Sequence, residues 1–209
     1  MKKVIIVDDH PVIRFAVKML LERSGMEVIA ETDNGVDALQ KTRDLAPDLV
    51  LLDIGLPKVD GFQVLQRLRA LDMPLKILIL TSQQSAHFAQ RCQKAGADGF
   101  VTKSDDLSEL LDAIRIVMRD YSFFPQTAYA TSSAQIIATD DGQLLSQLSD
   151  RELSVLIFIA EGLGNKQIGD RLLLSEKTIS TYKHRLKTKL NAQTVIELID
   201  FARRNQLIG

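Results

Sequence analysis

The chain has 209 residues, of which 45% are hydrophobic and 25% charged, which is typical of a globular protein with one or two domains. No apolar run reaches the roughly 18 residues that cross a membrane, and the single cysteine, Cys92, excludes an internal disulfide. No small-residue cleavage signal follows the N-terminus. We therefore expect a cytoplasmic protein that makes no membrane contact.

The net charge of -1 is unevenly distributed along the chain. Residues 1–122 carry 16 Lys and Arg against 18 Asp and Glu, whereas residues 147–209 carry 10 against 7. A polyanion such as nucleic acid would therefore bind the basic C-terminal part.

The first 120 residues alternate apolar, strand-like runs with helix-like segments. The predicted strands span 3–7, 26–30, 48–52, 76–80 and 98–101. The predicted helices span about 11–23, 35–45, 61–71, 85–95 and 106–119. Such alternation is typical of an α/β domain with a doubly wound parallel sheet.

The periodicity fails at residues 121–146, where a segment rich in Ser, Thr, Ala and Gln predicts a linker. Every later segment is helix-like, and the predicted helices span about 149–161, 166–172, 175–190 and 194–204. Ser149 and Glu152 have the spacing of a capping box at the start of the first of them. Four short helices indicate a small all-α domain containing a helix-turn-helix. The expected domains are therefore 1–120 and 147–209, joined by the linker 121–146.

Charged side chains follow three of the predicted strands at the point where each strand ends. Asp8 and Asp9 follow the first strand, Asp53 the third and Lys103 the fifth. These side chains should converge, because ligands bind at the carboxyl ends of the strands in open α/β sheets. Three carboxylates suit Mg²⁺, to which the Gly55 carbonyl could add a ligand, and a lysine suits a phosphoryl oxygen. The sequence therefore predicts a Mg²⁺-dependent, phosphoryl-accepting aspartate.

Within this predicted pocket each residue has an expected role. Asp53 would accept the phosphoryl group, while Asp8 and Asp9 would hold the metal. Thr81, which ends the fourth strand, could hydrogen-bond the same phosphoryl group. Phosphoryl transfer needs mainly positioning and charge neutralisation, which these groups can supply. Taken singly, each residue could equally be a helix cap or an ordinary strand end.

The helix predicted over 175–190 has an apolar stripe opposite a polar, basic face. The stripe should face the core and consists of Ile179, Tyr182, Leu186 and Leu190. The predicted DNA contacts lie on the other side and its flanks, at Lys177, Ser180, Thr181, Lys183, His184, Lys187 and Thr188. Arg185 and Lys189 complete the basic flanks. Short polar groups flanked by cations fit a DNA major groove, although a merely solvated basic face is the alternative.

Two groups of motifs resemble known families. Residues that resemble the receiver domain of two-component response regulators are Asp8-Asp9, Asp53, Leu56-Pro57, Asp60-Gly61, Thr81 and Phe100-Val101-Thr102-Lys103. Residues that resemble the LuxR-type helix-turn-helix are Leu148-Ser149-x-Arg151-Glu152, Gly162-Leu163-Gly164-Asn165-Lys166-x-Ile168 and Leu174-Ser175-x-Lys177-Thr178-Ile179. Together they resemble the NarL/FixJ class of response regulators. Thr181-Tyr182-Lys183 and Ala202-Arg203-Arg204-Asn205 further resemble its BvgA-like branch.

The resemblance implies a flavodoxin-like receiver with a five-stranded parallel sheet, followed by a four-helix LuxR-type domain. It implies a transcription regulator, not an enzyme. Phosphorylation of Asp53 by a sensor histidine kinase or phosphotransfer protein would control its sequence-specific binding to double-stranded DNA. Thr81 and Phe100 would move together as a switch on phosphorylation. RNA polymerase is a further candidate partner.

In that family the last helix often pairs two copies. Here Val195, Leu198, Ile199 and Ala202 form an apolar face that could make a homodimer or could simply close the chain's own bundle. Two other functions remain open. One is a regulator that acts without phosphate, through protein contacts alone. The other is a phosphohydrolase using Asp53 as its nucleophile, which would require a carboxylate where Gly55 stands.

Overall fold

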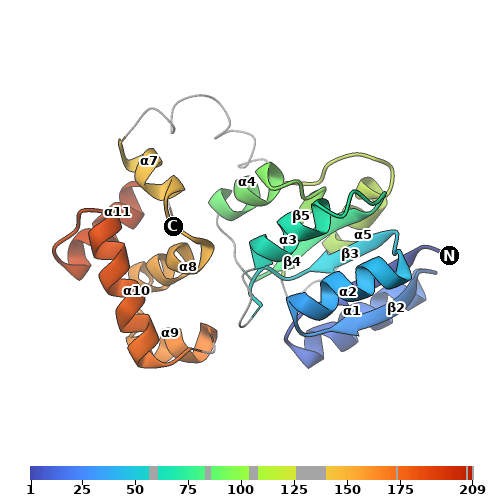
Figure 1. Ribbon diagram of the computed structural model, residues 1–209, viewed down its shortest axis with the longest axis horizontal. Coiled ribbons are helices and arrows are strands. Elements are labelled where there is room, and N and C mark those ends of the chain that lie inside the picture. Colours follow the sequence, from blue (N-terminus) through green and yellow to red (C-terminus); the bar gives the residue numbers. More distant parts are fainter. Residues whose placement is uncertain are drawn as a thin grey trace. The chain divides into compact units, whose positions relative to one another are not determined.

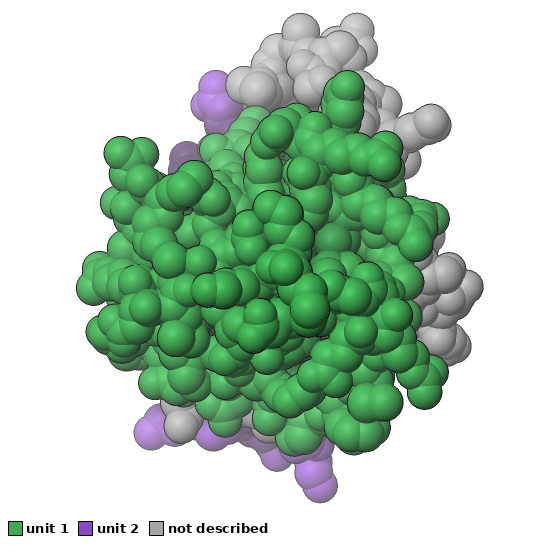
Figure 2. Space-filling model, turned by 90° about the vertical axis from the view of Figure 1, so that its right-hand side faces the viewer, with its two compact units in different colours: residues 1–128 green, residues 129–209 purple. Residues whose placement is uncertain are grey.

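The structure, a computed structural model, describes residues 1–56, 61–82, 86–103, 108–125, 140–172, 174–205 and 207–208. Residues 1–128 and residues 129–209 form two compact units, coloured separately in Figure 2. We call them unit 1 and unit 2. No helix in the described ranges is both long enough and apolar enough to cross a membrane.

Unit 1 is a five-stranded parallel sheet flanked by helices (Figure 1). The strands are β1 (Lys3–Val7), β2 (Glu27–Thr32), β3 (Leu49–Leu52), β4 (Lys76–Thr81) and β5 (Gly99–Thr102). The helices are α1 (Pro11–Arg23), α2 (Gly35–Leu45), α3 (Gly61–Arg69), α4 (Ala86–Lys94) and α5 (Ser108–Val117). The strand order β2-β1-β3-β4-β5 confirms the predicted doubly wound α/β fold.

The central strands are continuous apolar runs because both faces of the sheet are covered. All four residues of β3 are buried. On one face Leu51 and Leu80 belong to a core that includes Val17 of α1 and Ile114 of α5. Helices α2, α3 and α4 follow one another on the other side, where Phe62 of α3 stacks on Phe88 of α4. Each buried large apolar side chain contributes about 2 kcal/mol, so this layering holds the strand ends in place.

The residues directly after α5 cover the β5 edge of the sheet. The backbone N–H of Phe100 donates to the Phe123 carbonyl (2.7 Å), and the N–H of Phe123 donates to the Asp98 carbonyl (3.1 Å). A Cβ on Gly99 would lie 3.0 Å from the Phe123 carbonyl oxygen, so a glycine allows this close approach. Phe123, in the segment predicted as the linker, thus makes an isolated bridge to β5 of unit 1. The pairing is with a distant strand and leaves no local periodicity.

Unit 2 is entirely helical in its described residues (Figure 1). Its helices are α7 (Asp140–Ser146), α8 (Asp150–Ala160), α9 (Asn165–Leu172), α10 (Glu176–Lys189) and α11 (Val195–Arg204). Helices α8 to α11 are the four predicted ones. Helix α7 lies in the predicted linker, where it is held by tertiary contacts: Leu145 is buried, and Asp141 pairs with Arg204 (3.3 Å).

The turn between α9 and α10 is unusually close, and this fixes the direction of α10. The N–H of Leu174 donates to the Gly169 carbonyl (2.8 Å). A Cβ on Gly169 would lie 2.5 Å from the Leu174 carbonyl oxygen, so only glycine fits there. Ser175 then caps α10 by accepting a hydrogen bond from the N–H of Thr178 (3.1 Å). The pair α9–α10 is the predicted helix-turn-helix.

Candidate functional site

The carboxyl edge of the sheet brings the predicted charged residues together. Asp8 and Asp53 are buried, and the Lys103 side chain is only 6% exposed. Lys103 Nζ lies 2.7 Å from Asp8 Oδ2 and 2.6 Å from Asp53 Oδ2. Asp8 follows β1, Asp53 follows the adjacent strand β3, and Lys103 follows β5, which β4 separates from β3. The result is a buried cation bridging two carboxylates.

The protonated state of Lys103 is stabilised by this arrangement. Burial by itself lowers the pKa of Lys103, but the carboxylates of Asp53 and Asp8 outweigh it, and the pKa is raised above its ordinary value. The lysine is therefore a permanent positive charge at neutral pH. That charge lies beside the carboxylates of Asp8 and Asp53. It would also offset the negative charge of an anion that binds there.

The acidic residues also form a set that could hold a metal ion. Asp8, Asp9, His10 and Asp53 each offer a ligand atom, and these atoms lie within 4.8 Å of one another. Asp9 Oδ1 is buried without a hydrogen-bond partner. His10 Nδ1 is 2.8 Å from it, but the pair lacks hydrogen-bond geometry. Because an unsatisfied buried oxygen is costly, a cation there would be favourable. The carboxylate oxygens fit a hard divalent ion.

Of the remaining predicted residues, Gly55 contacts Asp53, whereas Thr81 and Phe100 lie on β4 and β5. The N–H of Gly55 donates to Asp53 Oδ1 (2.8 Å), and a Cβ at position 55 would lie 3.2 Å from that oxygen. Thr81 is buried at the end of β4, and its carbonyl accepts from the N–H of Lys103 (2.7 Å). Phe100 is buried on β5. The predicted loop residues Pro57 and Asp60 lie outside the described residues.

Among the four possible metal ligands, His10 is the one that the sequence motifs did not predict. Its own N–H donates to Asp8 Oδ1 (2.9 Å), and its side chain is 63% exposed. The available signal was its position directly after two acidic residues at a strand end. Arg14 Nη1, which donates to the Asp8 carbonyl (2.7 Å), helps to hold the same turn.

In unit 2, α10 presents most of the predicted DNA-contacting side chains to solvent. The exposed ones are Lys177, Ser180, Thr181, His184 and Thr188, and the half-buried ones are Lys183 and Lys187. The hydroxyls of Ser180, Thr181 and Thr188 each donate to the carbonyl four residues earlier, at 3.0, 3.1 and 3.1 Å. Ser180 Oγ also accepts from Asn165 Nδ2 of α9 (3.0 Å). The polar face is thus largely pre-organised.

The two half-buried lysines of α10 lie close enough to interact. Burial lowers the pKa of Lys183, and the neighbouring positive charge of Lys187 lowers it further. Both side chains lie on the flank of the helix. An anion between them would relieve their repulsion.

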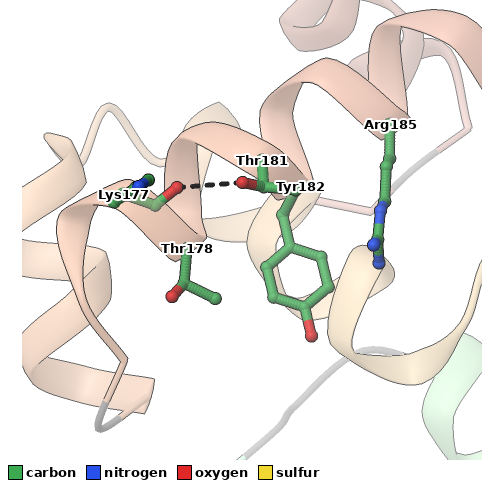
Figure 3. A pocket seen from close by; sticks show the side chains of 5 residues that line it. All are labelled: Lys177, Thr178, Thr181, Tyr182 and Arg185. Atoms are coloured by element: carbon green, nitrogen blue, oxygen red, sulfur yellow. Dashed lines mark hydrogen bonds between the residues drawn. The ribbon is translucent and has the colours of Figure 1, made fainter.

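The expectation that Tyr182 faces the core is met only in part. Tyr182 is half-buried and lines a hollow of about 250 Å³ with Lys177, Thr178, Thr181 and Arg185 (Figure 3). The core positions of the stripe, Ile179 and Leu186, are fully buried. A tyrosine that keeps its ring on the core margin can leave its hydroxyl in water.

The predicted dimer face is only partly available. Leu198 and Ala202 are fully buried, because α11 packs against α8 within the same unit. These two side chains therefore close the chain's own bundle, as the alternative expects, and the dimer face stays a prediction. Val195 is 37% exposed, Ile199 is half-buried and Ile196, not predicted, is 69% exposed. The apolar side chains that another copy could reach are these three, which we call the α11 ridge.

A buried ion pair ties the end of α10 to the start of α8. Glu152 Oε2 accepts from the N–H of Ser149 (2.8 Å) and from Lys189 Nζ (2.6 Å), which confirms the predicted capping box. Burial raises the pKa of Glu152, but Lys189 and Ser149 outweigh it, and the pKa ends below its ordinary value. Lys189 is consequently occupied by this pair.

Replacing Glu152 by Gln should destabilise unit 2 by about 2 kcal/mol at pH 7. This is less than the cost of breaking a fully buried ion pair, because the Lys189 side chain is 37% exposed and solvent screens its charge. A depressed carboxyl pKa stabilises the fold above the ordinary glutamate pKa of 4.5, and this stability is lost as pH falls through the lower folded value. Thermal melts of both proteins from pH 7 to pH 3 should therefore converge. A constant gap across that range would refute the charge assignment.

Comparisons with known proteins agree with this geometry. Residues 4–115 match the model of the response regulator receiver domain, and residues 146–202 match that of the bacterial regulatory proteins of the luxR family. The virulence-factor transcription regulator BvgA of Bordetella pertussis is 51% identical over 98% of both chains. The DNA-binding transcriptional activator EvgA of Escherichia coli is 36% identical over 97% of this chain and 98% of its own.

A solved structure has the same two-part architecture. The RcsB response regulator of Salmonella typhimurium is 25% identical, with a TM-score of 0.59, over 97% of this chain and 98% of its own. The named relatives are regulators of transcription, which agrees with the expectation of a non-enzymatic protein.

Proposed function

This chain belongs to the two-component response regulators that join a receiver domain to a LuxR-type DNA-binding domain, and we propose that Asp53 is its phosphoryl acceptor. The observation that carries the proposal is the meeting of Asp53, Asp8 and Lys103 at one edge of the sheet. The receiver would extend to about residue 125, because Phe123 pairs with β5. The DNA-binding domain would begin near residue 140, at α7.

A sensor histidine kinase or phosphotransfer protein would donate the phosphoryl group. An Asp53 carboxylate oxygen attacks phosphorus, the bond from phosphorus to the donor's histidine nitrogen breaks, and that nitrogen keeps the electron pair. Mg²⁺, held by Asp8, Asp9 and Asp53 with the Gly55 carbonyl as a further ligand, would neutralise charge on the phosphoryl oxygens. Lys103, already 2.6 Å from Asp53 Oδ2, would move onto a phosphoryl oxygen.

Gly55 supports a switch in preference to a phosphohydrolase. Hydrolytic turnover at Asp53 would need a second carboxylate as acid-base group two residues on, and a glycine stands there. The absence of a side chain also leaves space beside Asp53 Oδ1, where a Cβ would come within 3.2 Å. The site would hold a phosphoryl group for a time, and Thr81 and Phe100 would respond to it.

The output would be binding of α10 in the major groove of double-stranded DNA. Lys177, Thr181, His184 and Thr188 would face the bases, and Lys183, with Lys187, would contact phosphates.

Phosphorylation would favour a homodimer on paired half-sites. In the cytoplasm, RNA polymerase would be a partner at such sites. The acidic pocket contains all the residues that a phosphoryl-acceptor site requires, and this argues against a phosphate-independent regulator.

The experiment is selection of bound fragments from a genomic DNA pool, using the full chain with and without acetyl phosphate and Mg²⁺. We expect a common sequence to be recovered and its recovery to rise with the phosphodonor. Equal recovery under both conditions would favour the phosphate-independent regulator. Recovery of random fragments would argue against sequence-specific binding.

Replacing His184 by Ala is expected to weaken binding to the recovered sequence about tenfold and to reduce preference over unrelated DNA. Lys177→Ala, on the same exposed face, should have a similar effect. Fluorescence anisotropy at fixed salt measures both. The matched control is Arg203→Ala, an exposed cation on α11. Unchanged preference in the α10 variants would refute the assignment of this face.

A further inference from the structure

The hollow on α10 lies beside the face proposed to read DNA bases. Thr178, Tyr182 and Arg185 project from the same side of the helix at spacings of four and three residues (Figure 3). At about 100° per residue, this stripe is the neighbour of the exposed stripe formed by Lys177, Thr181, His184 and Thr188. The hollow, of about 250 Å³, is therefore at the margin of the proposed contact surface.

The chemistry of the hollow favours an anion. Its lining contains two cations, Lys177 and Arg185, together with three hydroxyl groups and no carboxylate. Among the residues that the structure describes, no ion pair or hydrogen bond occupies the Arg185 guanidinium or the Tyr182 hydroxyl. Both groups can therefore donate to a ligand.

The two donors are also positioned by each other. The Arg185 guanidinium carbon is 5.9 Å from the centroid of the Tyr182 ring, within the range of a cation–π contact. Thr181 Oγ1 donates to the Lys177 carbonyl (3.1 Å), so that hydroxyl offers a ligand only its lone pairs. The donating groups are thus the phenol and the guanidinium, at one end of the hollow, and Lys177 lies at the other end (Figure 3).

We propose that this hollow holds a phosphate of the DNA backbone, with Arg185 and Tyr182 as its donors, and that it sets the position of α10 in the groove. The proposal rests on the DNA-binding function proposed above. A helix in the major groove lies between two backbones, so side chains on its flanks meet phosphates while those at its centre meet base edges. Lys183 and Lys187 occupy the opposite flank. The helix would then be clamped between one phosphate on each side.

Phosphate contacts and base contacts give different signatures. Losing one phosphate contact weakens binding equally for all sequences and makes the negative salt slope, d log K/d log [salt], shallower by about 0.9. Losing a base contact instead reduces the preference for one sequence over another. The hollow is expected to give the first signature and His184 the second.

The test uses the full chain, phosphorylated by acetyl phosphate, with the selected DNA sequence and an unrelated duplex. Arg185→Gln should weaken binding to both duplexes about tenfold, which is typical of one charged hydrogen bond, and should make the negative salt slope shallower by about one. Tyr182→Phe should weaken both about fivefold with an unchanged slope, because it removes only a neutral hydroxyl. Arg203→Gln is the control for loss of charge from the same unit, and thermal melts verify folding.

A second measurement locates the contact. Single phosphates of the selected duplex are replaced in turn by neutral methylphosphonate. One position should weaken the wild-type protein and the Arg203→Gln control, but should cause no further loss in Arg185→Gln. Such non-additivity is expected only if the guanidinium binds that phosphate.

Three results would overturn the proposal. Arg185→Gln could behave like Arg203→Gln, its loss could fall on one duplex only, or no methylphosphonate position could couple to it. In each case the wild-type protein still binds DNA and the proposed function stands. Failure of the wild-type protein to bind either duplex would overturn both proposals.

Discussion

Replacing Asp53 by Asn should abolish labelling of the protein by radioactive acetyl phosphate in the presence of Mg²⁺. The amide has no carboxylate oxygen to attack phosphorus, and it removes the negative charge that Lys103 Nζ contacts at 2.6 Å. Among the described residues, Asp8 is the only other carboxylate that both contacts Lys103 Nζ and belongs to the group of possible metal ligands. Since Asp8 is assigned to the metal, a replacement acceptor is not expected. The loss of label should be complete.

The control for this experiment is Asp112→Asn, which removes an exposed carboxylate of α5 from the same unit. It should be labelled like the wild-type protein, and its label should be released by hydroxylamine, as an acyl phosphate is. Removing Mg²⁺ with a chelator should prevent labelling of both. Label that persists in Asp53→Asn, or that survives hydroxylamine, would contradict the assignment of Asp53.

Replacing Leu198 by Asp should unfold unit 2. Leu198 is fully buried where α11 packs on α8, so the substitution places an unpaired charge in the core. The substitution should reduce the free energy of unfolding by more than about 4 kcal/mol. A typical domain is stabilised by about 5–15 kcal/mol, and a domain as small as unit 2 is expected near the lower end of that range. Partial loss of the helical signal and early proteolysis of unit 2, with unit 1 and its five helices still folded, would be the observed result.

The matched control is Ile196→Asp on the same helix, where the side chain is 69% exposed. This variant should remain folded. If the α11 ridge of Val195, Ile196 and Ile199 pairs two copies, the Ile196→Asp protein should also sediment as a monomer under conditions in which the phosphorylated wild-type protein is a dimer. A dimeric Ile196→Asp protein would place the contact elsewhere, and a folded Leu198→Asp protein would contradict the packing of α11.

The α/β alternation, the parallel sheet and the convergence of Asp8, Asp53 and Lys103 were all predictable from the amino-acid sequence. The reason is that these depend on rules with short range or strict handedness. Apolar runs of four or five residues between amphipathic helices form parallel strands, and parallel strands place their carboxyl ends on one edge. The capping box at Ser149 and Glu152 is likewise a contact within one turn of helix.

Which polar groups are paired, and which side chains are buried, became known from the folded structure. It pairs Lys189 with Glu152, buries Leu198 and Ala202, and leaves Tyr182 at a surface hollow. An apolar stripe has the same spacing whether it meets its own bundle or another copy, and a basic residue has the same letter whether it meets a carboxylate or water. Helical periodicity gives a side chain's angle around its helix. The depth of the neighbouring surface at that angle depends on segments far away in the sequence, and here it separates buried Leu198 from exposed Ile196 on α11, and buried Ile179 from half-buried Tyr182 on α10.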